Sequence, residues 1–295
     1  MSADRIALSI RTEDLASVLD RHHDFRVQRR LVDMDRRAAT GGHAEGLVGL
    51  ALAIRTSGDD HRRHQVVELA VQRFRLDASD RIVETGGRRT WLEEPPTPIS
   101  GASARHYDLI DADLLGRAIS EGEATGLLLD VDFIVAHDAR VVRPFVERRL
   151  QSASGRPWAC SLGDIDWSKQ GFDGCRLPEL LGPMGWFYEA HRAEADVTAL
   201  LHLLDHRLGH GGTVAGHVLA RARRPCWIVD ADEVPVPATD VLSERGYRWD
   251  GFRRTWSASI ADDDVSDEIA WASMMLYGGR REPLARRVTW SERYA

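Results

Sequence analysis

The sequence predicts an α/β protein in which a mixed five-stranded sheet is flanked by helices and is followed by a separate, small α+β domain. Three observations predict this arrangement. Continuous apolar runs, typical of buried strands, alternate with amphipathic segments typical of helices. Turn-forming proline, glycine and aspartate residues separate these runs. After Gly211-Gly212 the pattern of strands and helices starts again, which is typical of a further domain.

The chain of 295 residues is therefore expected to divide into three segments. These are an N-terminal helix with a linker over 1–45, a larger domain over 46–213 and a small domain over 214–295. In the first segment, residues 12–31 are predicted to form an amphipathic helix with Leu15, Val18 and Leu19 on one face. Residues 33–45 are polar and contain glycine, which is typical of a linker.

The larger domain is expected to open with a β-meander. Strands are predicted at 47–54, at 65–74 and from 81 onward, with a hairpin turn at 77–80. Further along we expect a helix at 111–121, a central strand at 127–136, a helix at 143–150, loop and helix at 164–181, and a long helix at 189–207.

The C-terminal segment is predicted to have the order β-α-β-β-α-β. The expected elements are a strand at 226–229, a helix at 238–245, a hairpin of 247–249 with 255–258, a helix at 264–277 and a strand at 286–290. Trp249 and Trp256 are expected to pack in the core of this domain. Stacking on nucleic-acid bases is their alternative role, because arginines lie nearby in the sequence.

Composition limits the classes of function. A net charge of −7 excludes a polycation that coats nucleic acid non-specifically. Most arginines are expected on solvated surfaces, and one local phosphate-binding patch stays open as an alternative. The sequence contains no run of eighteen apolar residues, so no membrane helix is predicted. The first residues lack a signal-peptide pattern. We therefore expect a cytoplasmic protein with no membrane partner, whose three cysteines are reduced thiols.

Two segments carry a family resemblance. The first is I-V-A-H-D-A-R-V-V-R-P-F over 134–145, and the second is H-R-A-E-A-D over 191–196. They resemble the second and third motifs of the DEDDh 3′–5′ exonucleases, which include the proofreading subunit of bacterial DNA polymerase III and ribonuclease T. Pro98-Ile99 and His106 match a further family segment. The resemblance covers residues 46–207, and it implies a ribonuclease-H-like sheet.

In that family four carboxylates hold two divalent ions, Mg²⁺ or Mn²⁺, about 4 Å apart, and a histidine acts as general base. The resemblance places His191 at the base and Asp196 at the last carboxylate. In the second motif His137 is kept, Asp138 replaces the usual asparagine, and Val142 stands where a metal-binding aspartate is expected.

The first motif is aligned through the glutamate of the next strand, Glu68. Ten residues before it lies Gly58, so A-I-R-T-S-G over 53–58 corresponds to the family's D-x-E-T-T-G, and D-M-D over 33–35 is a decoy. Ala53 and Arg55 then replace two carboxylates. Guanidinium cannot ligate a metal, because it stays protonated and offers no lone pair. We expect Arg55 to pair with Asp196 or Asp138 in place of the lost ions.

The sequence thus favours a degenerate exonuclease homologue that uses no metal cofactor and binds a nucleic-acid end or a nucleotide without cutting it. The expected ligand-binding residues are Arg55, Thr56, His106, His137, Asp138 and Arg140. One alternative is a weakly active enzyme with a single Mg²⁺ or Mn²⁺ held by Asp138, Asp196, His191 and either Asp130 or Asp132. A protein-interaction module is the other. A protein partner and the oligomeric state, including a homodimer, stay open.

Overall fold

The computed structural model describes residues 11–36, 46–99, 109–234, 238–251 and 253–294. The larger domain is built on one mixed sheet, as predicted. Its strands are β2 (Val48–Thr56), β3 (Val66–Leu76), β4 (Ile82–Thr85), β5 (Arg89–Leu92), β6 (Phe133–Ala136) and β7 (Trp158–Cys160). The order is β4-β3-β2-β6-β7, and β5 also pairs with β3. Strands β4 and β5 bind successive stretches of β3, so the sheet has five positions.

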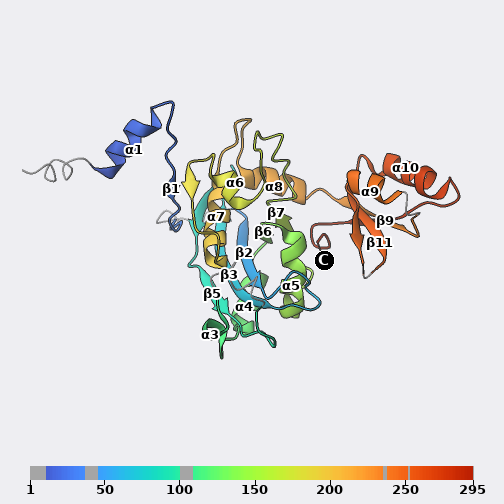
Figure 1. Cartoon of the computed structure of the whole chain (residues 1–295), viewed down its shortest axis with the longest axis horizontal. Helices are drawn as coiled ribbons and strands as arrows, with labels where there is room; N and C mark the ends of the chain where they lie inside the picture. The colour runs from blue at the N-terminus through green and yellow to red at the C-terminus, as the bar shows by residue number, and fades with distance from the viewer. Residues whose placement is uncertain (1–10, 37–45, 100–108, 235–237, 252, 295) are drawn as a thin grey trace, which may run out of the picture.

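Strand directions give the sheet the ribonuclease-H-like arrangement that was expected. β2 runs antiparallel to β3 but parallel to β6, and β6 runs parallel to β7. Since side chains alternate along a strand, Leu50 and Leu52 face one side of the sheet and Ala51 the other. Each side is covered by its own helices (Figure 1).

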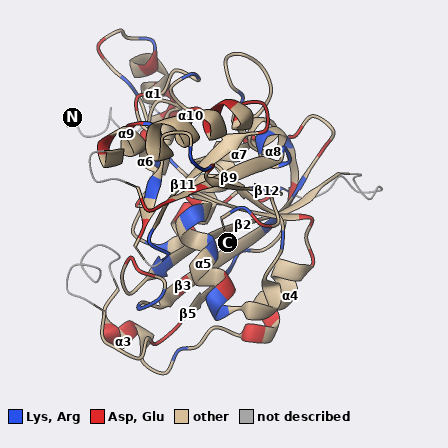
Figure 2. Ribbon diagram, turned by 90° about the vertical axis from the view of Figure 1, so that its right-hand side faces the viewer, with Lys and Arg blue, Asp and Glu red and all other residues tan. Residues whose placement is uncertain are grey.

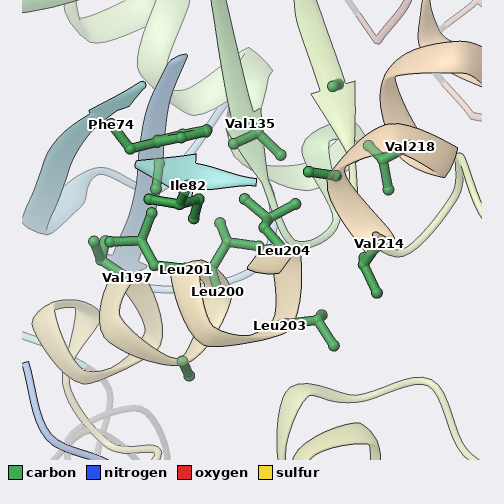
Figure 3. Close-up of a cluster of buried hydrophobic side chains, with 14 of the residues drawn as sticks. Phe74, Ile82, Val135, Val197, Leu200, Leu201, Leu203, Leu204, Val214 and Val218 are labelled. Atoms are coloured by element: carbon green, nitrogen blue, oxygen red, sulfur yellow. The ribbon is translucent and has the colours of Figure 1, made fainter. Parts of the chain in front are cut away.

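Helices α4 (Glu121–Leu129) and α5 (Ala139–Arg149) pack in the cluster of Leu50 and Leu52. On the opposite side lie α6 (Leu177–Leu181), α7 (Ala193–Asp205) and α8 (Val214–Ala222). Figure 3 shows the leucines of α7 beside Phe74, Ile82 and Val135 of the sheet. The expected class, a mixed sheet flanked by helices, is confirmed.

Several predicted boundaries are wrong. The helix at 111–121 is instead a short helix, α3 (Asp111–Leu114), followed by α4. The strand predicted from 127 starts at Phe133, because residues 127–129 complete α4 and bury Leu128. The long helix begins at Ala193 instead of 189, since a short strand, β8 (Trp186–Phe187), and a turn precede it.

The N-terminal segment also differs from its prediction. The helix α1 spans only Thr12–Asp20, and its apolar side chains Leu15, Val18 and Leu19 are 40–58% exposed. The chain then forms β1 (Arg29–Arg30), which pairs in parallel with β8. Leu31 and Met34 are buried in the α7 cluster, and we therefore propose that residues 31–36 belong to the larger domain. Residues 37–45 lie outside the described part.

The C-terminal domain has the predicted order β-α-β-β-α-β. Its elements are β9 (Cys226–Asp232), α9 (Thr239–Glu244), β10 (Arg248–Asp250), β11 (Thr255–Ala261), α10 (Val265–Tyr277) and β12 (Leu284–Val288). The antiparallel sheet has the order β10-β11-β9-β12. Helix α8, which lies beyond the boundary expected at residue 213, packs in the core of the larger domain. We therefore propose that the small domain begins after Ala222.

The last residues of the chain return to the larger domain. The Trp290 ring stacks on Phe133 with centroids 6.2 Å apart, and the Trp290 carbonyl accepts a hydrogen bond from the Trp158 amide. Arg143 of α5 donates to the carbonyls of Ser291 (2.7 Å) and Arg293 (2.6 Å). The residues after β12 therefore pack against β6, β7 and α5 of the larger domain.

Candidate functional site

The parallel strands β2, β6 and β7 end at the same edge of the sheet, where ligands commonly bind in α/β proteins. Arg55 and Thr56 close β2, and His137 and Asp138 follow β6. Ser161 follows β7 and lies beside His137. The topology therefore brings the first and second motifs to one edge, as the resemblance requires.

Arg55 forms an ion pair with Asp196, as predicted. Its Nη2 atom lies 2.8 Å from Asp196 Oδ2, and the two side chains are 12% and 17% exposed. Ala53 and Arg55 point to the α7 side of the sheet, because they alternate with buried residues of the other face along β2. Asp196 lies in the first turn of α7, so the third motif meets the first across this interface.

Arg55 also ties the segment before α7 to the sheet. Its Nε donates to the His191 carbonyl (3.2 Å) and its Nη2 to the Ala190 carbonyl (3.1 Å). The Tyr188 hydroxyl donates to Asp196 Oδ1 at 3.1 Å. Burial raises the pKa of the Asp196 carboxyl, and Arg55 partly offsets this effect. Both oxygens of Asp196 are thus engaged by protein donors.

Glu68 is a site residue that sequence reasoning used only as an alignment marker. It lies opposite Arg55 in the β2–β3 register and is fully buried. Its Oε2 accepts from the Ala193 amide (2.8 Å), and its Oε1 accepts from Arg192 Nε (3.0 Å). A carboxylate at the start of a helix is favourable, because the first amides there lack partners. Glu68 therefore fixes where α7 begins.

The second motif is split between several environments. His137 Nδ1 lies 2.9 Å from Ser161 Oγ, and burial lowers the pKa of His137 to about 4, so the ring is neutral at pH 7. Asp138 precedes α5 with a left-handed backbone (φ 64°), which aspartate tolerates. Arg140 is exposed, whereas Val142 is buried in the apolar cluster on the α5 side of the sheet.

The remaining predicted residues can be placed as follows. Thr56 is buried at the end of β2, and the side chain of His191 is exposed in front of α7. His106 lies outside the described residues. The structure therefore brings Arg55 and Asp196 into contact, while Val142 stays in the core on the other side of the sheet.

The pKa of His137 predicts a pH dependence of stability. Between pH 6.5 and 4 the unfolded chain binds a proton at this histidine and the folded chain does not, so acid favours unfolding. From pH 7 to pH 5 we expect this residue to cost about 2 kcal/mol of unfolding free energy, at 1.36 kcal/mol per pKa unit. His137→Asn should keep the Ser161 hydrogen bond and lose that part of the pH dependence in urea denaturation. The exposed His210→Asn is the control, and equal pH profiles for both variants would contradict the prediction.

The residues present do not fit the family's two-ion centre. Mg²⁺ and Mn²⁺ require oxygen ligands, yet the motif positions hold Ala53, Arg55 and Val142, and the Arg55 guanidinium lies 2.8 Å from the remaining carboxylate. Within the described ranges, the only trio of His, Cys, Asp or Glu side chains with ligand atoms all within 4.8 Å is that of His22, His23 and Asp24. This trio is exposed near α1, far from the motifs in the sequence.

The alternative ligand set is also not assembled. Asp132 accepts a hydrogen bond from the Val48 amide (2.8 Å), and Asp130 pairs with Arg73 (2.7 Å). Both precede β6 and so lie at the end of the sheet opposite to His137 and Asp138. The hypothesis that Asp130 or Asp132 joins a rebuilt metal site is therefore wrong, because a strand separates them from it.

Comparison with known proteins gives similarity only at the level of structure. No protein-family model and no curated protein matches the sequence. Exonuclease X in complex with 5′ overhanging duplex DNA is similar at 16% identity and a TM-score of 0.40, over 52% of this chain and 88% of that chain.

In the described residues, no helix has the length and apolar character that crossing a membrane requires.

Two structures of exonuclease I are also similar. The E. coli enzyme in its zinc-bound complex with single-stranded DNA matches at 14% identity and a TM-score of 0.47, over 63% of this chain and 48% of that chain. A product-bound exonuclease I matches at 13% identity and a TM-score of 0.44, over 63% and 52%. This chain thus spans about half the length of exonuclease I. All three similarities are of structure alone, at identities of 13–16% and TM-scores of 0.40–0.47.

Proposed function

We propose that this protein is a catalytically degenerate homologue of the DEDDh exonucleases that binds a nucleic-acid end without metal-dependent cleavage. The observation that carries the proposal is the ion pair of Arg55 with Asp196, at 2.8 Å, between the first and third motifs. A guanidinium there supplies the positive charge that metal ions supply in the family. It forms no metal-bound hydroxide, so the chemistry of hydrolysis is lost while the fold is kept.

The local charges support this interpretation. Two carboxylates, Asp196 and Glu68, are each paired with an arginine, Arg55 and Arg192. A buried ionised carboxylate without a partner is costly. In an active enzyme the ions neutralise such carboxylates, whereas here the protein's own cations do so. The pairing also explains why Asp196 is retained although three of the four family carboxylates are replaced.

The nuclease assay is the direct test of degeneracy. We expect the purified protein and its His191→Ala variant to trim labelled single- and double-stranded DNA and RNA equally little, in Mg²⁺ and in Mn²⁺. Loss of a general base typically lowers turnover 10²–10⁴-fold, so genuine activity would separate the two proteins. Trimming that is lost both in the variant and in chelator would show that the enzyme is active and that the proposal is wrong.

Metal affinity gives a second test. By calorimetry we expect no Mn²⁺ binding tighter than roughly millimolar, the range of weak oxygen sites. The double substitution Ala53→Asp and Arg55→Glu returns two carboxylates to the α7 side of the sheet, where Asp196 lies, and should tighten Mn²⁺ binding at least tenfold, provided circular dichroism shows a folded protein. Asp196→Asn in that background is the control and should abolish the gain. Micromolar binding by the unmodified protein that disappears in Asp196→Ala would refute the absence of a metal site.

A further inference from the structure

A groove of about 410 Å³ separates the C-terminal sheet from the larger domain. Helices α9 and α10 cover one face of this sheet through Val229 and Ala231, so the alternate residues Ile228 and Asp230 face the other way. Figure 2, seen from the side of the C-terminal domain, shows α9 and α10 on one side of the strands and α5 on the other. The helix-free face of the sheet is one wall of the groove, and Arg140 at the start of α5 belongs to the opposite wall.

The groove gathers arginines from four separate elements. Arg140 comes from α5, Arg221 from α8, Arg248 from β10 and Arg286 from β12. None of these four side chains forms an ion pair within 4 Å in the described part of the chain, whereas many other described arginines do. Hydrogen bonds from Thr289 lower the pKa of Glu292, and the charge of Arg286 adds a smaller contribution in the same direction. A chain of net charge −7 thus brings four arginines without an ion pair closer than 4 Å among the described residues into one place.

The acidic side chains of the groove are already engaged. Asp164 pairs with Arg293, and Asp250 lies 3.6 Å from Arg62. Glu292 accepts hydrogen bonds from the amide and the hydroxyl of Thr289, both at 2.9 Å. The free hydrogen-bonding capacity of the groove therefore consists largely of guanidinium donors, which match the geometry of phosphate oxygens.

Trp249 of the edge strand β10 also belongs to the lining of the groove, and its ring centroid lies 5.8 Å from that of Trp256. It is 52% exposed, whereas its neighbour Trp256 is half-buried against the core of the small domain. Cationic side chains that follow a phosphate backbone, combined with an aromatic ring on which a base stacks, are the combination by which proteins bind single strands. Bases in a duplex are stacked on each other and cannot use such a ring in this way.

We propose that this groove binds single-stranded nucleic acid, with phosphates on Arg140, Arg221, Arg248 and Arg286 and one base on Trp249. The inference deepens the proposed function, on which it rests. Arg140 lies two residues after Asp138 and three after His137 along the chain, and the Arg62–Asp250 contact joins the loop after β2 to β10. A strand held in the groove therefore extends toward the edge that carries the degenerate motifs.

Fluorescence anisotropy with the full-length protein tests this inference. The probes are labelled dT₁₂ and rU₁₂ oligonucleotides, titrated at several salt concentrations. Each single-strand phosphate contact contributes about 0.7 to the salt slope, so Arg140→Ala with Arg248→Ala should reduce the slope by about 1.4 and weaken binding roughly 25-fold at 0.1 M salt. The control, Arg21→Ala with Arg26→Ala, removes the same charge from the exposed N-terminal segment and should leave both values unchanged.

Trp249 gives an independent readout. Trp249→Ala should weaken binding about fivefold or more with an unchanged salt slope, and Trp249→Phe should recover most of the loss, because stacking needs a ring and no charge. All of these substitutions are at exposed positions, and the folding of each variant is to be checked by circular dichroism.

The outcomes separate the two proposals. If the unmodified protein binds neither oligonucleotide, the proposed function fails together with this inference. If it binds and the groove variants bind like the control, only the groove is wrong and another surface holds the strand. Displacement of the oligonucleotide by poly-glutamate at equal affinity would show that the groove accepts acidic proteins, which would also overturn the assignment to nucleic acid.

Discussion

Arg55→Ala is expected to lower the free energy of unfolding by about 3 kcal/mol, the lower end of the cost of breaking a buried ion pair. The lower end applies because the two side chains are 12% and 17% exposed. Among the described residues, the substitution leaves the Tyr188 hydroxyl as the only side-chain donor to Asp196, and it removes the donor that holds the carbonyls of Ala190 and His191. Urea denaturation followed by circular dichroism measures the change.

Two comparisons make this expectation specific. Arg73→Ala on the neighbouring strand breaks an exposed pair with Asp130 and should cost less than about 1 kcal/mol. In the double variant Arg55→Ala with Asp196→Ala, the loss should be smaller than the sum of the single losses, since one interaction is removed twice. If Arg55→Ala were as mild as Arg73→Ala, Arg55 would not be the substitute for the lost ions.

Arg293→Ala should have the largest effect on stability, about 3–5 kcal/mol, because its partner is left as an unpaired charge in the interior. Arg293 and Asp164 are 4% and 1% exposed, and the Tyr294 hydroxyl donates to the same carboxylate at 3.0 Å. The arginine also lies between the two domains, with Cys226 of β9 at 3.9 Å. Its loss should therefore weaken the attachment of the C-terminal domain as well as the core.

Denaturant unfolding together with limited proteolysis of the folded protein measures both consequences. The matched control is Arg287→Ala, which removes an exposed arginine of β12 whose pair with Asp262 spans 3.4 Å. Compared with the unmodified protein, we expect Arg293→Ala to be cleaved faster between the domains. The control should be cleaved at an unchanged rate. Equal stability and equal cleavage in the two variants would mean that the residues after β12 do not hold the domains together.

The sequence was sufficient for the larger features of the fold because they depend on patterns within short segments. Apolar runs gave β2 and β3, and the alternation of elements gave the β-α-β-β-α-β order of the small domain. Short elements with little pattern of their own, such as β5 and β8, could not be predicted, since pairing with another strand is what makes them strands. The end of α1 was missed for a related reason, as residues 29–30 join β8 instead of continuing the helix.

The candidate site likewise has features that the sequence predicts and features that depend on the tertiary structure. The sequence by itself predicts, through the resemblance, that Ala53, Arg55 and Val142 stand where the DEDDh exonucleases have carboxylates, and it determines that Arg55 is long and cationic enough to pair with Asp196. Only the tertiary structure decided that Glu68 fixes the start of α7, that Val142 turns into the core, and that four arginines from separate elements meet in one groove. Residue chemistry is local and can be read along the chain, whereas a contact between distant residues exists only after strand pairing and helix packing have set their separation in space.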